Sequence, residues 1–162
     1  GLIVNSTSHG YVRINSSATT TASWLAHDQG GTGRWLAGVE GSQTKWQLYS
    51  AGTQFSVDTS GNVTATGDIT AYSDESLKTN IQVIDNAVGK VEQLHGITFD
   101  RIADGSSSTG VIAQELKAVL PEAVHTDEQG LHSIAYGNVV GLLIEAIKEQ
   151  QKQIDELRLN KS

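Results

Sequence analysis

The spacing of hydrophobic residues along the chain changes close to residue 73. Before that point, short runs of alternating apolar and polar residues are separated by turn-forming residues, a pattern that predicts strands and turns. The expected strands are 11–14, 23–27, 34–39, 45–49, 54–57 and 62–66. Turn signals such as Gly30-Gly31 and Ser60-Gly61-Asn62 lie between them. We therefore predict a β-rich first part of the chain.

Three tryptophans of this part, Trp24, Trp35 and Trp46, recur at intervals of eleven residues. That spacing fits successive short strands that each present one aromatic side chain to the same layer. We expect these side chains to be core residues of a meander. A platform that stacks against a sugar is the alternative, and it requires the rings to be exposed.

After residue 73 the hydrophobic residues recur every three to four positions, which indicates helices. We predict a helix over 76–94, a strand over 97–102 and a polar loop over 104–109. A strand leading into a helix follows over 110–120, and Pro121 closes that helix. The last helix is expected from about residue 136 to residue 159.

This last helix carries the spacing of a coiled coil. One heptad position holds Val140, Ile147 and Ile154, and the other holds Leu143, Gln150 and Leu157. We interpret Gln150 as a residue that fixes the register. β-Branched residues at the first position with leucine at the second suit dimers, so this pattern alone does not predict a trimer.

Composition supports a division into two parts. Residues 1–72 hold twenty Ser or Thr, ten Gly and seven of the nine aromatic residues. So short and polar a segment cannot bury a generous core alone, which favours burial between several copies. The chain has no cysteine, so disulfides and thiol chemistry are excluded. It has no methionine either, and we expect it to be a piece of a longer protein.

Charge and hydropathy argue against several classes of partner. The net charge is −7, most of it in residues 73–162, whereas a protein that binds duplex nucleic acid normally has a basic face. The longest strongly apolar stretch, 139–144, is far shorter than the roughly 20 residues of a membrane span. The five histidines are scattered without metal-ligand spacing, so we expect no metal site and no cofactor.

The junction between the two parts reads Ser73-Asp74-Glu75-Ser76-Leu77-Lys78-Thr79-Asn80-Ile81. It resembles the opening of the peptidase S74 family, the intramolecular chaperone domains that end endosialidases, tail fibres and neck appendages of phages. Residues 110–116, 119–124 and 140–149 resemble later blocks of that family in the same order. One departure is Ser76, where many relatives have arginine or lysine.

The resemblance implies a homotrimer: a β-rich fibre segment, 1–73, followed by a mixed α/β chaperone domain, 74–162, that ends in a long coiled-coil helix from about residue 136. The domain would help the fibre to fold and then be released by its own cut between Ser73 and Asp74. Ser73 would be the nucleophile and Lys78 the base of a serine-lysine dyad. Asn80 and Gln114 are candidates for orienting the cut peptide.

The chemistry of the junction agrees with this assignment in part. A serine hydroxyl needs a neighbouring base, and a lysine amine accepts a proton only when it is neutral, which requires burial away from water. We therefore expect the cut to wait for assembly of the trimer. Attack by Ser73 on its own carbonyl passes through a four-membered ring, whereas attack on the carbonyl of Tyr72 passes through a five-membered ring. The bond between Tyr72 and Ser73 thus remains an alternative site of the cut.

Other interpretations of the chain stay open at this point. Ser73 or Asp74 before a periodic helix also fits a helix N-cap without any catalysis. The whole chain fits a trimeric adhesin tip that is not cut and that binds a host surface polysaccharide. A domain that frees a DNA-binding factor from a membrane is less favoured, because a basic domain and a membrane span are missing. The expected location is a virion tail fibre, with the chaperone acting in the cytoplasm of the infected host.

Overall fold

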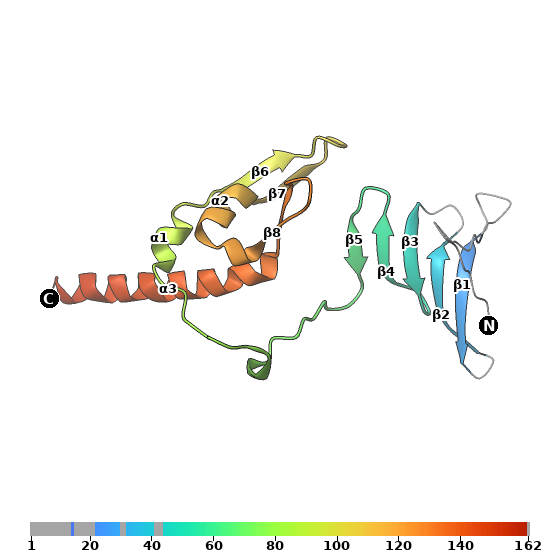
Figure 1. Ribbon diagram of the computed structural model, residues 1–162, viewed down its shortest axis with the longest axis horizontal. Helices are drawn as coiled ribbons and strands as arrows, with labels where there is room; N and C mark the ends of the chain where they lie inside the picture. The colour runs from blue at the N-terminus through green and yellow to red at the C-terminus, as the bar shows by residue number, and fades with distance from the viewer. Residues whose placement is uncertain (1–13, 15–21, 30–31, 41–43, 162) are drawn as a thin grey trace. The chain divides into compact units, whose positions relative to one another are not determined.

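The structure, a computed structural model, describes residue 14 and residues 22–29, 32–40 and 44–161. The chain divides into two compact units, Gly1–Asp74 and Glu75–Ser162. The first is built of strands, and the second mixes short strands with helices and ends in a long helix (Figure 1). The strand predicted over 11–14 lies outside the described residues except for Ile14. None of the described helices is both long and apolar enough to cross a membrane.

The first unit contains a five-stranded antiparallel meander in which the strands follow one another in chain order. The strands are β1 (Ser23–Gln29), β2 (Thr32–Val39), β3 (Lys45–Tyr49), β4 (Thr53–Asp58) and β5 (Val63–Ala65). All five were predicted, with bounds that differ by at most a few residues. The turn before β5 is held by Asp58, whose carboxylate accepts hydrogen bonds from the N–H groups of Ser60 and Asn62, both at 2.9 Å.

Strand pairing places most apolar side chains of the sheet on one side, because residues directly opposite each other share a face. We call this side the apolar face; its members are Leu25, Trp35, Ala37, Val39, Trp46, Leu48, Phe55, Val57, Val63 and Ala65. Trp24 pairs with Gly38 and therefore lies on the opposite face, where its ring is 5.9 Å from that of Tyr49.

The prediction that the three tryptophans share one core layer is therefore wrong. Trp35 and Trp46 share the apolar face but are 45% and 44% exposed, and Trp24 lies on the other side of the sheet. The reason is the register: Trp24 lies opposite Gly38, and Trp35 is an odd number of residues from Gly38 along β2.

The second unit opens with the single-turn helix η1 (Glu75–Leu77) and the short helix α1 (Ala87–Val91). Two hairpins and two further short helices follow: β6 (Gly96–Asp100), β7 (Ser107–Val111), α2 (Ala113–Val119), η2 (Pro121–Ala123), β8 (Val124–Thr126) and β9 (His132–Ile134). The long helix α3 (Tyr136–Leu159) has the predicted bounds. Ala87 of α1 and Leu142 and Ala146 of α3 form the centre of a small core.

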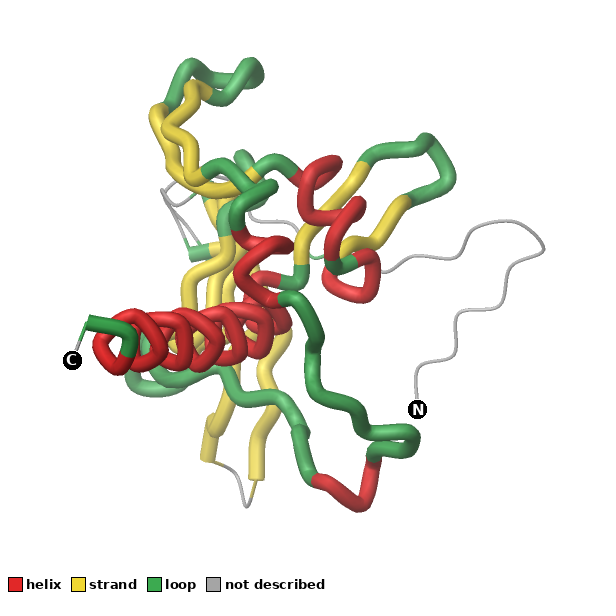
Figure 2. Tube along the Cα trace, turned by 90° about the vertical axis from the view of Figure 1, so that its left-hand side faces the viewer, coloured by secondary structure: helices red, strands yellow, loops and turns green. Residues whose placement is uncertain are grey.

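The helix predicted over 76–94 is wrong. Only η1 and α1 are helical, and the chain between them is irregular, as the loop colour in Figure 2 shows. Asn80 and Asn86 have φ angles of 52° and 46°, left-handed conformations that asparagine tolerates and that interrupt a right-handed helix. The polar loop predicted over 104–109 is shorter than expected, because Ser107–Val111 forms β7. The hairpin of β8 and β9 was not predicted.

Candidate functional site

The predicted cleavage residues lie in a long exposed connection. Every residue from 66 to 83 is exposed, and Ser73 and Asp74 lie within this stretch. The side chain of Tyr72, which precedes them, is 96% exposed. The boundary between the two compact units falls directly after Asp74. A peptide bond in such a segment is accessible, and its cleavage would break none of the sheet or helix hydrogen bonds.

Lys78, the predicted base, follows η1 directly. Its backbone N–H donates a hydrogen bond of 3.0 Å to the carbonyl oxygen of Glu75, so η1 fixes the turn between Asp74 and Lys78. The lysine is exposed, as is Ser73. Among the residues that the structure describes, the single chain therefore does not bury either member of the predicted dyad.

The two candidate orienting residues lie on different elements. Asn80 occupies the left-handed turn after Lys78, and Gln114 lies exposed in the first turn of α2. Their orienting role stays a prediction. The N-cap alternative for Ser73 and Asp74 assumed a helix over 76–94; the structure has the three-residue η1 there, directly after Asp74, and for this shorter helix the alternative stays a prediction.

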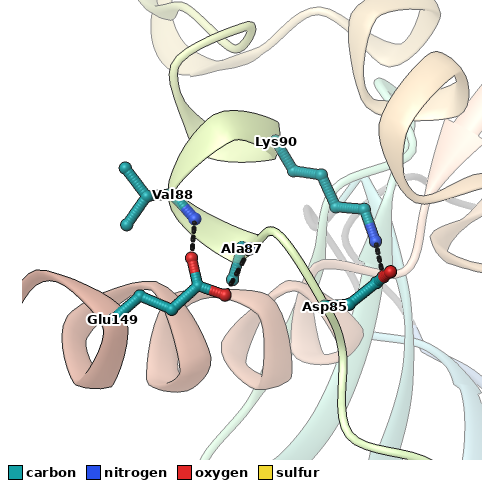
Figure 3. Close-up of polar contacts among 5 residues, drawn as sticks. All are labelled: Asp85, Ala87, Val88, Lys90 and Glu149. Atoms are coloured by element: carbon teal, nitrogen blue, oxygen red, sulfur yellow. Dashed lines mark hydrogen bonds and ion pairs between the residues drawn. The ribbon is translucent and has the colours of Figure 1, made fainter. Parts of the chain in front are cut away.

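The exposed connection is anchored to the long helix by Glu149 (Figure 3). One carboxylate oxygen accepts the N–H of Ala87 and the other accepts the N–H of Val88, each at 2.9 Å. These are first-turn donors of α1 that have no partner within their own helix. Asp85, just before α1, accepts a hydrogen bond of 3.0 Å from Lys90. The connection thus ends in a short helix that α3 holds by two charge-assisted hydrogen bonds.

These contacts lower the pKa of two carboxyl groups, Glu149 and Asp85. The hydrogen bond from the N–H of Val88, followed by that from Ala87, lowers the pKa of Glu149 below its usual value, although the nearby charge of Asp85 opposes this. The hydrogen bond from Lys90 and its positive charge lower the pKa of Asp85. Both groups are therefore carboxylates at neutral pH, as their partners require.

Helix α3 presents two different faces. Leu142, Ala146 and Glu149 are spaced for one face of a helix, and Leu142 and Ala146 are buried against residues of the same chain. The predicted heptad seam lies on another face, where Val140, Ile147 and Ile154 are 53%, 65% and 44% exposed. The described part of the single chain thus leaves these three seam side chains at least 44% exposed.

Sequence reasoning missed the role of Glu149. Its contacts join residues 61 and 62 positions apart, which no local pattern reveals. A signal was nevertheless present, because Glu149 lies seven residues after Leu142 and three after Ala146 and therefore shares their face. A carboxylate on the buried face of a helix requires hydrogen-bond donors from a neighbouring element.

Comparison with known proteins gives a family match for the segment that begins at the predicted cleavage residues. Residues 73–125 match the peptidase S74 family, described as chaperone of endosialidase. The match begins at Ser73 and covers η1, α1, β6, β7 and α2. It confirms the resemblance inferred from the junction motif. The family is one of self-cleaving, peptidase-like domains.

Curated relatives are long tail fibre proteins of phages. The chain is 36% identical over 94 residues to long tail fiber protein Gp37 of Enterobacteria phage K3, covering 52% of this chain and 8% of that protein. It is 38% identical over 101 residues to Gp37 of Enterobacteria phage M1, covering 56% and 40%. Gp37 of Salmonella phage S16 is 31% identical over 102 residues, covering 56% and 14%. The chain thus spans less than half the length of these relatives.

Proposed function

We propose that this chain is the chaperone-bearing end of a trimeric phage tail fibre. Residues 74–162 drive three chains together, assist the folding of the β-rich segment 1–73, and are then released by their own cut at Ser73-Asp74. The observation that carries the proposal is the match of residues 73–125 to the chaperone of endosialidase, which starts at the serine of the proposed cut. Similarity to long tail fibre proteins supports a place in the virion.

The uncovered seam of α3 supports assembly into a coiled coil. Isoleucine and valine at one heptad position and leucine at the other are exposed in the single chain and become buried when identical helices associate. Because Leu142 and Ala146 already pack on a different face of the helix, α3 can hold its own chain and other copies at the same time.

The proposed cut adds one water molecule across one peptide bond. The carbonyl carbon of Ser73 ends as a carboxylate, and the nitrogen of Asp74 leaves as an amine. Lys78, neutral in a site dried by assembly, takes the proton of the Ser73 hydroxyl, and the hydroxyl oxygen then bonds to the carbonyl carbon of Ser73. Lys78 passes the proton to the nitrogen of Asp74 as the peptide bond breaks, and one water molecule hydrolyses the resulting cyclic ester to the carboxylate. A cut at the Tyr72–Ser73 bond through a five-membered ring is the alternative route. Ser73 and Lys78 are both exposed in the single chain, which supports a reaction that starts only after assembly.

The chaperone role is tested by truncation. Three chains that must align strands with many non-local contacts fold slowly, and an attached trimeriser raises their local concentration. We expect a chain that ends at Ser73 to aggregate or stay unfolded, whereas fibre cut after assembly persists as a trimer. Light scattering and circular dichroism after heating compare the two. A truncated chain that forms the same heat-resistant trimer would contradict the chaperone role.

A non-cleaving adhesin tip remains the second candidate. Its supporting observation is the exposure of Trp35 and Trp46, since exposed aromatic rings can stack on sugars. It predicts one intact chain of 17.2 kDa and binding to a host polysaccharide.

A further inference from the structure

The segment that carries Lys78 is fixed to the rest of the second unit downstream of that lysine. All residues from 66 to 83 are exposed, whereas Ile84 packs against the small core of Ala87, Leu142 and Ala146. Ile84 also lies against α3 at Gly141, where an added β-carbon would be 3.6 Å from its terminal methyl group. The path of the chain from Lys78 to Ile84 is therefore set at its far end by the way α1 sits on α3.

Glu149 fixes both the position and the direction of α1 (Figure 3). Its two carboxylate oxygens accept the N–H groups of Ala87 and Val88 separately, each at 2.9 Å. Two hydrogen bonds to one planar carboxylate restrain direction as well as distance, and a charged acceptor makes each bond stronger than a neutral one would be. The ion pair of Lys90 with Asp85 adds little, because Asp85 is 93% exposed.

Glu149 shares a turn of α3 with residues of the predicted seam. Ile147 and Gln150 belong to the two heptad positions, and Ile147 is 65% exposed in the single chain. Association of α3 with other copies would bury this side of the turn and restrain its rotation. A helix is a rigid element, so a restraint on one of its faces also holds the other. One turn of α3 thus contains both an assembly contact and the anchor of α1.

We propose that Glu149 is a positioning residue for the cut: through α1 it holds the segment of Lys78 in its working path once α3 has assembled. This role rests on the proposed function and deepens it by naming a residue through which assembly reaches the dyad. Glu149 itself takes part in no bond-making step. A displacement of about 1 Å at a reacting group can cost on the order of 100-fold in rate, so loss of the anchor should slow the cut.

The carboxylate of Glu149 can be replaced with little change of shape. A glutamine has one acceptor oxygen in place of two, and its amide nitrogen would face a second N–H donor of α1. Glu149→Gln therefore removes half of the two-pronged contact while keeping the length of the side chain. Glu145→Gln is the matched control on the same helix, since Glu145 forms an ion pair with Lys148.

Pulse labelling of the full-length chain measures the cut separately from assembly. After a short pulse of synthesis, the fraction of trimer is followed on native gels and the fraction of cut chain on denaturing gels. We expect Glu149→Gln to form the trimer and then to be cut at least about ten times more slowly than wild type. Glu145→Gln should be cut at the wild-type rate.

A second control separates positioning from loss of stability. Leu116 is fully buried in α2 and lies outside the core around Ala87. Leu116→Ala leaves a cavity and should lower the unfolding temperature at least as much as Glu149→Gln, yet its trimer should be cut at the wild-type rate. If Leu116→Ala does not form the trimer, the milder Leu116→Val takes its place. A cut that slows equally in the Leu116 variant would show that the rate follows stability and would refute the positioning role.

The other outcomes also decide between the alternatives. Cleavage of Glu149→Gln at the wild-type rate within the trimer would overturn the positioning role and leave the proposed function intact. Failure of Glu149→Gln to form the trimer would mean that Glu149 acts in assembly, which overturns the positioning role as well. A wild-type trimer that stays uncut would overturn the proposed function itself.

Discussion

At the scale of single residues, the proposed cut depends on the amine of Lys78. Lys78→Arg keeps the positive charge and much of the length, but a guanidinium is not deprotonated at ordinary pH and cannot serve as a base. We expect cleavage to stop while the trimer still forms, as seen by denaturing gels and light scattering. Since Lys78 is exposed in the single chain, the substitution removes no core packing. Cleavage at the wild-type rate would eliminate lysine as the base.

Glu149 gives a second prediction at this scale. Its pKa is lower in the folded protein than its ordinary value of 4.5, so its contacts with α1 stabilise the fold above that value. This stabilisation is lost as the pH falls through the lowered folded pKa. Glu149→Gln should therefore reduce thermal stability at pH 7, and the difference from wild type should shrink in acid.

The matched control for that variant is Glu145→Gln. Glu145 forms an ion pair with Lys148 of the same helix, at 2.7 Å, and because the lysine is exposed this contact is worth less than about 1 kcal/mol. Calorimetry of both variants at several pH values separates the two roles. If Glu149→Gln and Glu145→Gln behave alike at pH 7, Glu149 does not anchor α1.

At the scale of elements, the two faces of α3 predict different effects for neighbouring leucines. Leu142 is fully buried, and Leu142→Ala should destabilise the second unit by about 2–5 kcal/mol at every protein concentration. Leu143 is 44% exposed on the seam, so Leu143→Ala should chiefly weaken association. Its unfolding temperature should then depend more steeply on protein concentration than that of wild type. Equal concentration dependence in both variants would contradict the assignment of the faces.

The helices and strands also show which features of the fold a sequence pattern predicts. Helix α3 lies where it was predicted, from about residue 136 to residue 159, because its period of three to four persists over 24 residues. The same period over 76–94 predicted a helix that is not there, because Asn80 and Asn86 take left-handed conformations that a hydrophobic pattern does not encode. The five strands of the first unit were predicted from alternation and turns. Which face each tryptophan occupies depends on pairing register, which alternation within one strand does not reveal.

At the scale of the whole molecule, both units leave apolar surface uncovered. The fibre unit exposes one face of its sheet, and the second unit exposes the seam of α3. The connection that joins the units is exposed throughout and contains the predicted cut. We account for all three features by an assembly that forms first and is cut afterwards. The junction motif predicted the family match that begins at Ser73, whereas the anchor at Glu149 needed the tertiary structure.

The central claim, release of an assembly domain by its own cut, is tested most directly by the mass of the freshly purified chain under denaturing conditions. We predict two pieces, corresponding to residues 1–73 and 74–162, from a sample that light scattering shows to be a trimer before denaturation. Pieces ending at Tyr72 and beginning at Ser73 would support the alternative bond, since they differ from the first pair by the mass of one serine. A single chain of 17.2 kDa that stays intact in the assembled trimer would contradict the account.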